Sequence, residues 1–165
     1  MSHQTVIVLD FGGQYNQLIA RRVRECNVYC EVMPCTTPLS QLKAMDPIGI
    51  IFTGGPNSVY LDSSPHVDPE IFTWGVPILG ICYGCQLMAH TLGGQVTEAQ
   101  DDSAREYGKT QTYYDTTSPL FKGLPQEGIS WMSHGDYMAK VPESFRLVAH
   151  SDACPTVGIC DEARG

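Results

Sequence analysis

The feature that most constrains this chain is a cysteine flanked by glycines, set between a short apolar run and a helical pattern. Residues 77–81 form an apolar run behind a proline, as expected of a buried parallel strand. From Gly84 onwards, apolar residues recur at the spacing of a helix face, and Gly93-Gly94 ends the pattern. Cys82 lies between strand and helix, with Gly80 two residues before it, so the chain carries Gly-x-Cys-x-Gly, the cysteine form of the nucleophile elbow.

This motif predicts a reactive side chain at Cys82. The sharp turn lifts the side chain above the carboxyl edge of the sheet, and glycines let the helix start close to the strand. A helix N-terminus beneath the sulfur favours the thiolate, lowering a pKa that is ordinarily about 8.5. The alternative is a buried structural cysteine at a strand–helix junction. Strand, turn and helix in this order favour the nucleophile.

Strand and helix patterns alternate over the first half of the chain. Apolar runs predict strands over residues 5–10, 28–33 and 47–53. Helical patterns cover residues 14–26, 38–45 and 68–74. The first of these helices is expected to present one face made of Tyr15, Leu18, Ile19, Val23 and Cys26. The alternation predicts an α/β fold, a flavodoxin-like doubly wound and mostly parallel sheet with ligands at its carboxyl edge.

The pattern changes after Gly94. Strands with little helix between them are predicted over residues 95–99, 109–114, 129–133, 145–150 and 156–160, with one helical turn at 118–123. They indicate a small mixed or antiparallel extension of the fold, with a polar surface loop over residues 98–105. Because neither a repeat nor a low-complexity linker interrupts the chain, residues 1–165 are predicted to form one domain.

Composition narrows the class of function. A chain of 165 residues is long enough for one domain with a sizeable core. Its formal net charge of −8 argues against nucleic acid or an anionic membrane as a partner. The sequence holds no apolar run of membrane-spanning length and no signal-peptide pattern. Its seven irregularly spaced cysteines are expected to be reduced thiols in a cytoplasmic protein.

A second motif is expected to lie beside Cys82. Gly54-Gly55 follows the strand predicted over residues 47–53, so both motifs fall on the carboxyl edge of a parallel sheet. The backbone N–H of Tyr83 and one from the Gly54-Gly55 loop would then bracket a developing oxyanion. Each such donor is typically worth about 3 to 4 kcal/mol in the transition state. A thiolate with an oxyanion hole indicates acyl transfer through a thioester.

Polar residues near the elbow are candidates for substrate binding. Gln86 lies one helical turn past Cys82 and either points into the same pocket or is a helix-surface glutamine. Ser133-His134 follows a predicted strand, and its backbone is expected to reach the pocket. His134 is a base, a binding residue or a satisfied polar group. His90 lies two turns below the sulfur, where a structural role is expected.

Four segments together resemble the class I glutamine amidotransferase family. They are Gly80-Ile-Cys-Tyr-Gly-Cys-Gln86, Thr53-Gly-Gly-Pro-Asn-Ser-Val-Tyr60, Asp10-Phe-Gly-Gly-Gln-Tyr-Asn-Gln17 and Met132-Ser-His-Gly-Asp136. The resemblance covers essentially the whole chain and implies the three-layer architecture of that family. Within the family, Tyr83, Ser133-His-Gly-Asp136 and Arg105-Glu-Tyr-Gly108 are similar to the amidotransferase domains of GMP synthases.

The resemblance implies a role for each candidate residue. Cys82 takes the glutamyl group from glutamine and frees ammonia, while Tyr83 and a glycine of Gly54-Gly55 supply the oxyanion hole. Gln86 and the Ser133-His134 backbone hold the α-amino and carboxylate groups of glutamine. Ammonia passes to an ATP pyrophosphatase (synthetase) domain or subunit, which uses ATP and Mg to aminate xanthosine monophosphate in GMP biosynthesis. No cofactor or metal is expected in this domain, and any homodimer is expected to form through the synthetase part.

Two departures from the family pattern bear on activity. The family completes its site with a His-Pro-Glu segment, which nothing here matches, and no synthetase domain is present. The chain is therefore expected to be truncated at its C-terminus and to have little glutaminase activity alone. The other departure is Cys85, where the family usually has an apolar residue; we expect Cys85 to pack under the elbow helix.

Other functions stay open. Cys82-x-x-Cys85 has the form of a dithiol redox motif, although this leaves Gln86 and the Gly54-Gly55 loop unexplained. A non-catalytic binding module would keep the fold and lack the base. Another synthase, of the anthranilate or carbamoyl phosphate type, would use the same amidotransferase chemistry.

Two further clusters are weaker signals. Cys26, Cys30 and Cys35 have no second paired cluster of the kind that zinc sites require. Arginines on the first helix form either a solvated basic face or a partner surface; they are Arg21, Arg22 and Arg24.

Overall fold

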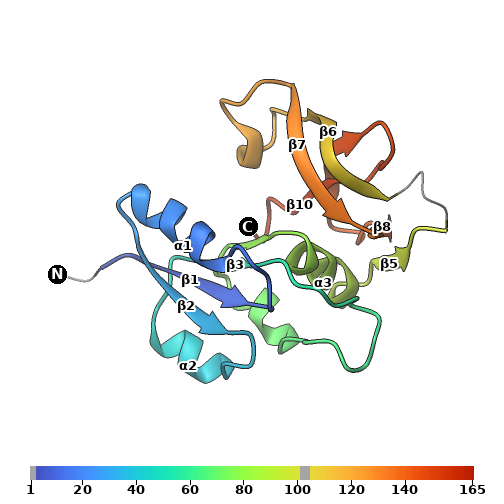
Figure 1. Ribbon diagram of the computed structural model, residues 1–165. Coiled ribbons are helices and arrows are strands. Elements are labelled where there is room, and N and C mark those ends of the chain that lie inside the picture. The colour runs from blue at the N-terminus through green and yellow to red at the C-terminus, as the bar shows by residue number, and fades with distance from the viewer. Residues whose placement is uncertain (1–2, 101–104) are drawn as a thin grey trace. The chain divides into compact units, whose positions relative to one another are not determined.

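The computed structural model describes residues 3–100 and 105–165 (Figure 1). They form two compact units, one comprising residues 3–88 with 164–165 and the other residues 89–100 with 105–163. The first holds the parallel sheet predicted for the first half of the chain, and the second holds the antiparallel strands. No helix among the described residues is long and apolar enough to cross a membrane.

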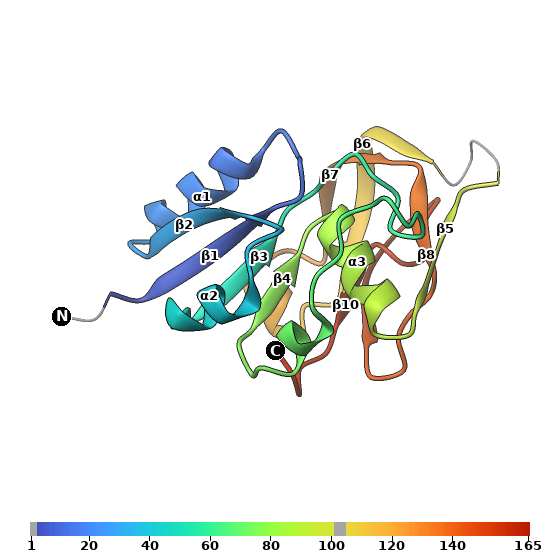
Figure 2. The same ribbon diagram turned by 90° about the horizontal axis from the view of Figure 1, so that it is seen from below.

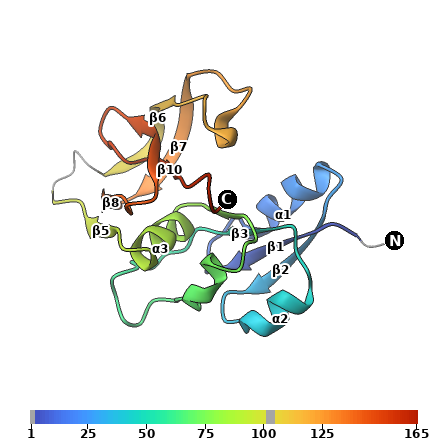
Figure 3. The same cartoon turned by 180° about the vertical axis from the view of Figure 1, so that it is seen from behind.

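The first unit is built on a four-stranded parallel sheet of order β2-β1-β3-β4 (Figure 2). Its strands are β1 (Thr5–Asp10), β2 (Tyr29–Pro34), β3 (Gly49–Phe52) and β4 (Ile78–Gly80). Between them run α1 (Asn16–Glu25), α2 (Leu39–Ala44) and the short 3₁₀ helix η1 (Pro69–Phe72), and α3 (Tyr83–Thr91) follows β4. Helix α1 lies on one face of the sheet and α2 on the other (Figures 1 and 3). This is the doubly wound arrangement that the alternating pattern predicts.

The core beneath α1 shows which side of this helix packs on the sheet. Val8, Ala20 and Cys30 form a buried cluster, with Ile19 and Val23 against it. The prediction was right for Ile19 and Val23 but wrong for the other three residues of the expected face, which are exposed: Tyr15, Leu18 and Cys26. The buried stripe instead runs through Asn16 and Ala20, because a small residue lets the helix lie close to β1.

Strand β4 is less buried than its apolar sequence suggests. It lies at one end of the four-strand order; Leu79 within it and Ile81, the residue after it, are each 38% exposed. The expectation of a fully buried strand is therefore wrong, because an apolar run does not reveal whether a strand has neighbours on both sides. The helix predicted over residues 68–74 is the shorter η1, whose first turn is capped by the Asp68 side chain accepting from the Glu70 N–H at 2.9 Å.

The second unit is an antiparallel sheet of order β10-β9-β6-β7 with a separate β5–β8 pair (Figure 3). Its elements are β5 (Gln95–Glu98), β6 (Glu106–Tyr114), η2 (Pro119–Phe121), β7 (Glu127–His134), β8 (Asp136–Lys140), β9 (Arg146–Ser151) and β10 (Gly158–Cys160). The predicted strands and helical turn are found. Strand β8 is not among them, because its pairing with β5 joins segments far apart in sequence. Residues 101–104 of the predicted polar loop lie outside the described residues.

Candidate active site

Cys82 sits at the junction of β4 and α3 in a strained backbone conformation. Its φ is 53°, in the left-handed region that residues other than glycine rarely adopt. Its side chain is exposed at the carboxyl end of the parallel sheet. Such strain costs roughly 1–3 kcal/mol and collects at functional sites, where the surrounding structure holds it in place. The geometry is that of the elbow that the sequence predicts.

The two glycines of the elbow are required by close packing. A Cβ on Gly84 would lie 2.5 Å from the Phe52 Cβ and 2.6 Å from the Phe52 carbonyl oxygen. A Cβ on Gly80 would lie 2.7 Å from the Cys85 backbone nitrogen. Because only glycine fits at these positions, α3 starts directly against the ends of β3 and β4.

The Gly54-Gly55 loop lies beside the elbow. A Cβ on Gly54 would lie 3.4 Å from the Cys82 Cβ and 3.8 Å from its Sγ, so the α-carbon of Gly54 faces the cysteine side chain. On its other side the loop packs against the segment after β1, since a Cβ on Gly55 would lie 2.3 Å from the Phe11 carbonyl oxygen. The loop therefore runs directly beside the Cys82 side chain.

The side chain of Tyr83 is turned into the protein, which leaves only its backbone for substrate contact. The ring is 1% exposed, packs on Phe11 at 5.5 Å between ring centres, and donates its hydroxyl hydrogen bond to the Pro65 carbonyl oxygen. Burial raises the pKa of Tyr83 to about 12, so the phenol stays protonated and remains a donor. Its N–H belongs to the first turn of α3, where N–H groups have no acceptor within the helix.

The remaining residues of the elbow helix are Cys85 and Gln86. Burial, followed by the neighbouring Cys82 thiolate, raises the pKa of Cys85 to about 12. A thiol that stays protonated at neutral pH is a slow partner in disulfide exchange, so the dithiol interpretation loses support. None of the seven cysteines, all of them in the described part of the chain, forms a disulfide. Gln86 is half-buried, and its N–H donates to the Cys82 carbonyl oxygen at 3.1 Å.

In the second unit, the ring of His134 at the end of β7 is held by two hydrogen-bond partners. Its Nε2 lies 2.9 Å from the Glu106 carboxylate, and its Nδ1 lies 3.1 Å from the Asp136 carbonyl oxygen. The buried Glu106 also accepts from the Ser151 hydroxyl. Both ring nitrogens therefore have hydrogen-bond partners. This arrangement favours a structural role for His134 over a general base.

Among the described residues, the predicted site residues are therefore distributed over both units. Gly54, Gly55, Cys82, Tyr83 and Gln86 come together in the first unit, while Ser133 and His134 belong to the second. Sequence reasoning missed two buried polar residues that hold these segments, Thr53 and Glu106. Thr53 begins the segment that contains Gly54-Gly55, and Glu106 lies in the Arg105–Gly108 segment. Their place in these two segments is the only sign of their importance in the sequence. Within residues 3–100 and 105–165, no group of three His, Cys, Asp or Glu side chains is placed to hold a metal ion.

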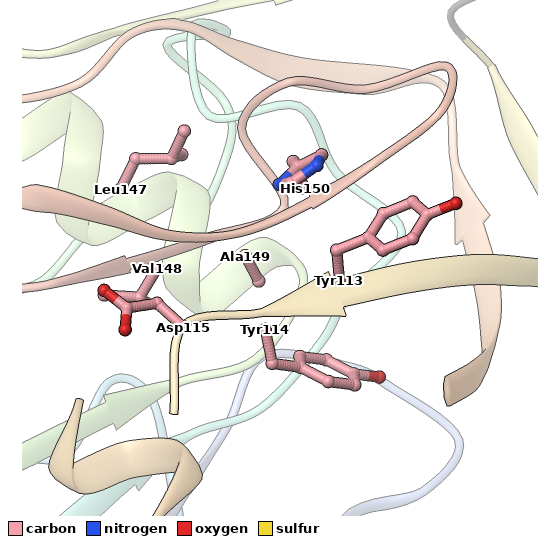
Figure 4. Close-up of a pocket in the computed structure, with 7 residues that line it drawn as sticks. All are labelled: Tyr113, Tyr114, Asp115, Leu147, Val148, Ala149 and His150. Carbon is pink, nitrogen blue, oxygen red and sulfur yellow. The ribbon is translucent and has the colours of Figure 1, made fainter. Parts of the chain in front are cut away.

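A shallow hollow in the second unit lies between β6 and β9 (Figure 4). Its volume is about 220 Å³, and the rings of Tyr113 and His150 stack beside it at 5.0 Å between their centres. None of its residues was a predicted site residue; they are Tyr113, Tyr114, Asp115, Leu147, Val148, Ala149 and His150.

Comparison with known proteins agrees with this geometry. The model of the glutamine amidotransferase class-I family matches residues 7–164, and the chain belongs to that family. Among its relatives, the GMP synthase [glutamine-hydrolyzing] of Clostridium perfringens is 57% identical over 159 residues, covering 96% of this chain and 31% of that protein. The enzyme of the same name from Caldicellulosiruptor saccharolyticus is 60% identical over 154 residues, covering 93% of this chain and 30% of that protein. The chain spans less than a third of the length of these relatives.

Solved structures show the same fold. A Thermoplasma acidophilum protein, provisionally described as one subunit of a GMP synthase, matches with a TM-score of 0.85 and 29% identity, covering 99% of this chain and 81% of that one. A glutamine amidotransferase from Thermotoga maritima matches with a TM-score of 0.76 and 20% identity, covering 97% of this chain and 72% of that one. The class I amidotransferase architecture that the sequence predicts is therefore confirmed.

Proposed function

We propose that this chain is the glutamine-hydrolysing part of a GMP synthase. One observation carries the proposal: at a strained elbow, the exposed Cys82 faces Gly54, where a Cβ would lie 3.4 Å from the cysteine Cβ and 3.8 Å from its Sγ. A nucleophile and a bare backbone loop at one sheet edge suit attack on a carbonyl group. The names of relatives that are 57% and 60% identical favour glutamine as the substrate and GMP synthesis as its purpose.

The proposed reaction passes through a thioester. The Cys82 thiolate attacks the side-chain amide carbon of glutamine, and the carbonyl oxygen becomes an oxyanion that accepts from the Tyr83 N–H and an N–H of the Gly54-Gly55 loop. The nitrogen takes up a proton, the C–N bond breaks and ammonia leaves; water then hydrolyses the glutamyl thioester to glutamate and returns the Cys82 thiol. Removing one such N–H donor typically costs about 100- to 1,000-fold in kcat.

Recognition of the rest of the substrate is assigned to other residues. We keep Gln86 and the backbone of Ser133-His134 as the groups that bind the α-amino and carboxylate groups of glutamine, as the family resemblance implies. The proton acceptor is not assigned to His134, since both of its ring nitrogens already have hydrogen-bond partners.

Ammonia is proposed to reach a synthetase part that uses ATP and Mg to aminate xanthosine monophosphate. Because this chain spans less than a third of its relatives, that chemistry belongs to a further domain or a partner subunit. Reduced cysteines suit a cytoplasmic setting for such a pathway.

The test is a pair of serine variants in the native protein that carries this sequence. Cys82→Ser should abolish glutamine-dependent GMP formation while leaving amination by added ammonium salts within about 2-fold, because only the glutamine site loses its nucleophile. Cys26→Ser, at another exposed cysteine, is the matched control and should keep both activities. Glutamine-dependent activity that survives Cys82→Ser would overturn the proposal.

A further inference from the structure

Thr53, which follows β3 directly, is a buried hydrogen-bonding centre behind the elbow. Its side chain is 0% exposed, and its N–H donates to the Leu9 carbonyl oxygen at 3.2 Å. Its carbonyl oxygen accepts from the Gly84 N–H at 3.1 Å, and its hydroxyl accepts from the Phe11 N–H at 3.1 Å. One residue therefore ties the segment after β1, the end of β3 and the first turn of α3 together.

The direction of the Thr53 hydroxyl proton is set by these partners. Because a backbone N–H from Phe11 occupies a lone pair of the oxygen, the hydroxyl hydrogen is left for the Gly54 carbonyl oxygen, 3.1 Å away. The Gly54 carbonyl and the Gly55 N–H are the two ends of one planar trans peptide. Fixing the carbonyl therefore also fixes the direction of the N–H.

This peptide has little else to hold its orientation. With glycine on both sides, neither residue of the peptide has a side chain of its own to restrict its rotation. A Cβ on Gly13 would lie 2.6 Å from the Gly54 carbonyl oxygen, which shows how closely the segment after β1 approaches. Such contacts limit how far the peptide can shift. The hydrogen bond from the Thr53 hydroxyl is directional, so it selects one orientation of the peptide plane.

We propose that Thr53 is a positioning residue for the oxyanion hole. It holds the Gly54–Gly55 peptide so that the Gly55 N–H, and not that of Gly54, is the second donor beside the Tyr83 N–H. This inference rests on the proposed function, because it concerns the same tetrahedral intermediate on Cys82. Thr53 itself touches neither the substrate nor the reacting atoms.

The test compares Thr53→Val with Thr53→Ser in the native protein that carries this sequence. Valine keeps the shape and removes the hydroxyl, while serine keeps the hydroxyl and removes a methyl group. A misdirected donor should lower kcat for glutamine hydrolysis about 10- to 100-fold in Thr53→Val, somewhat less than complete loss of a donor, with KM changed less than about 3-fold. Thr53→Ser should stay within about 3-fold of the wild type in kcat.

Two reagents for Cys82 separate positioning from a general structural effect. Glutamate γ-semialdehyde adds to the thiolate to give a tetrahedral hemithioacetal, whose oxygen needs the hole. Iodoacetamide alkylates the thiolate by displacing iodide and forms no oxyanion. In Thr53→Val, affinity for the aldehyde should fall by the same factor as kcat, while the alkylation rate of Cys82 stays within about 2-fold.

The possible failures are distinguishable. If the wild type shows no Cys82-dependent glutamine hydrolysis, the proposed function fails and this inference fails with it. If the wild type is active and Thr53→Val keeps kcat within about 3-fold, or loses alkylation and aldehyde binding equally, the positioning role is overturned while the proposed function stands. If Thr53→Val melts below the assay temperature, Thr53→Ala replaces it. The same measurements of kcat, aldehyde affinity and alkylation rate then test the positioning role.

Discussion

The α-carbon of Gly54 faces the side chain of Cys82, so that a Cβ on Gly54 would lie 3.4 Å from the cysteine Cβ and 3.8 Å from its Sγ. These are ordinary van der Waals distances. The fold therefore accommodates a methyl group at Gly54, but that group would occupy space beside the sulfur that an approaching substrate needs.

Gly54→Ala should consequently separate folding from activity. We expect a melting temperature close to that of the wild type, and kcat/KM for glutamine lowered about 100-fold because the amide carbon is displaced from the sulfur. Gly49→Ala, on β3, is the matched control, since its Cβ would lie 3.8 Å from the Pro77 carbonyl oxygen. Steady-state kinetics with glutamine on both variants measure this effect. If Gly54→Ala keeps the wild-type kcat/KM, the substrate does not approach the Cys82 sulfur from the Gly54 side.

Tyr83→Phe tests how the elbow is tied to the loop beneath it. The lost hydroxyl donates to the Pro65 carbonyl oxygen, and its removal should cost about 1–2 kcal/mol of unfolding free energy. The pH dependence should change as well. The pKa of Tyr83 in the fold, about 12, lies above the ordinary value of about 10, so the neutral phenol stabilises the fold below pH 10 and this contribution is lost as pH rises toward 12.

Urea unfolding between pH 8 and pH 11.5 measures both effects of Tyr83→Phe. The variant should lose less stability than the wild type over the alkaline part of this range. Tyr107→Phe, at a tyrosine that is 69% exposed, provides the control and should leave the curve unchanged. An alkaline loss of the same size in Tyr83→Phe and wild type would show that the phenol is not held neutral by the fold.

Cys85 should be chemically silent beside a reactive Cys82. With the pKa of Cys85 at about 12, only about one thiol in ten thousand is ionised at pH 8. Iodoacetamide at that pH should leave Cys85 unmodified in folded protein, as peptide mass mapping would show. Cys85→Ser should keep glutamine hydrolysis within about 3-fold, since Cys85 takes no part in the proposed chemistry. Loss of function on this substitution would instead support the dithiol interpretation.

Much of this site could be predicted because its signals are local. The Gly-x-Cys-x-Gly spacing encodes a turn that only glycines permit, and the packing of Gly80 and Gly84 supplies the physical reason. Alternating strand and helix periods place Gly54-Gly55 at the same edge as Cys82, because parallel strands end together. Periodicity also locates α1, although its packed face runs through Ala20, which a search for large apolar residues overlooks.

What sequence reasoning missed depends on contacts between distant segments. The partners of Thr53 lie far away in sequence, in Leu9, Phe11 and Gly84, and no local pattern announces them. The pairing of β8 with β5 and the end position of β4 are likewise properties of the assembled sheets. Local patterns therefore predict elements and turns, whereas hydrogen-bond centres and strand neighbours emerge only from the fold.

Glu106 is the centre of such a network in the second unit. Its side chain is 4% exposed, its carboxyl group lies 2.9 Å from the His134 Nε2, and it accepts a hydrogen bond from the Ser151 hydroxyl. Glu106→Gln keeps the shape of the side chain, but it places an amide NH₂ group against one of these two partners and removes the carboxyl group. We expect a loss of about 3 kcal/mol in unfolding free energy, as when one partner of a buried pair is removed.

Denaturant titration of Glu106→Gln gives this value directly. Glu127→Gln, at an exposed glutamate on β7, is the control and should change stability by less than about 0.5 kcal/mol. Equal effects of the two substitutions would mean that the Glu106 network contributes nothing specific to the fold.

Asn16 presents the opposite case, a buried polar group whose removal should stabilise the protein. It is 8% exposed at the start of α1, and its Oδ1 has no hydrogen-bond partner among the described residues. A buried acceptor left unpaired costs about 1–3 kcal/mol. Asn16→Leu keeps the branched shape of the side chain, removes the unpaired acceptor and has better helix propensity, so it should raise the unfolding free energy by about 1 kcal/mol. Asn16→Asp should lower it, because an unpaired buried charge outweighs the gain of about 0.3–1 kcal/mol from the helix dipole. Thermal unfolding of the two variants checks both signs, and a destabilised Asn16→Leu would show that the amide has a partner in solution.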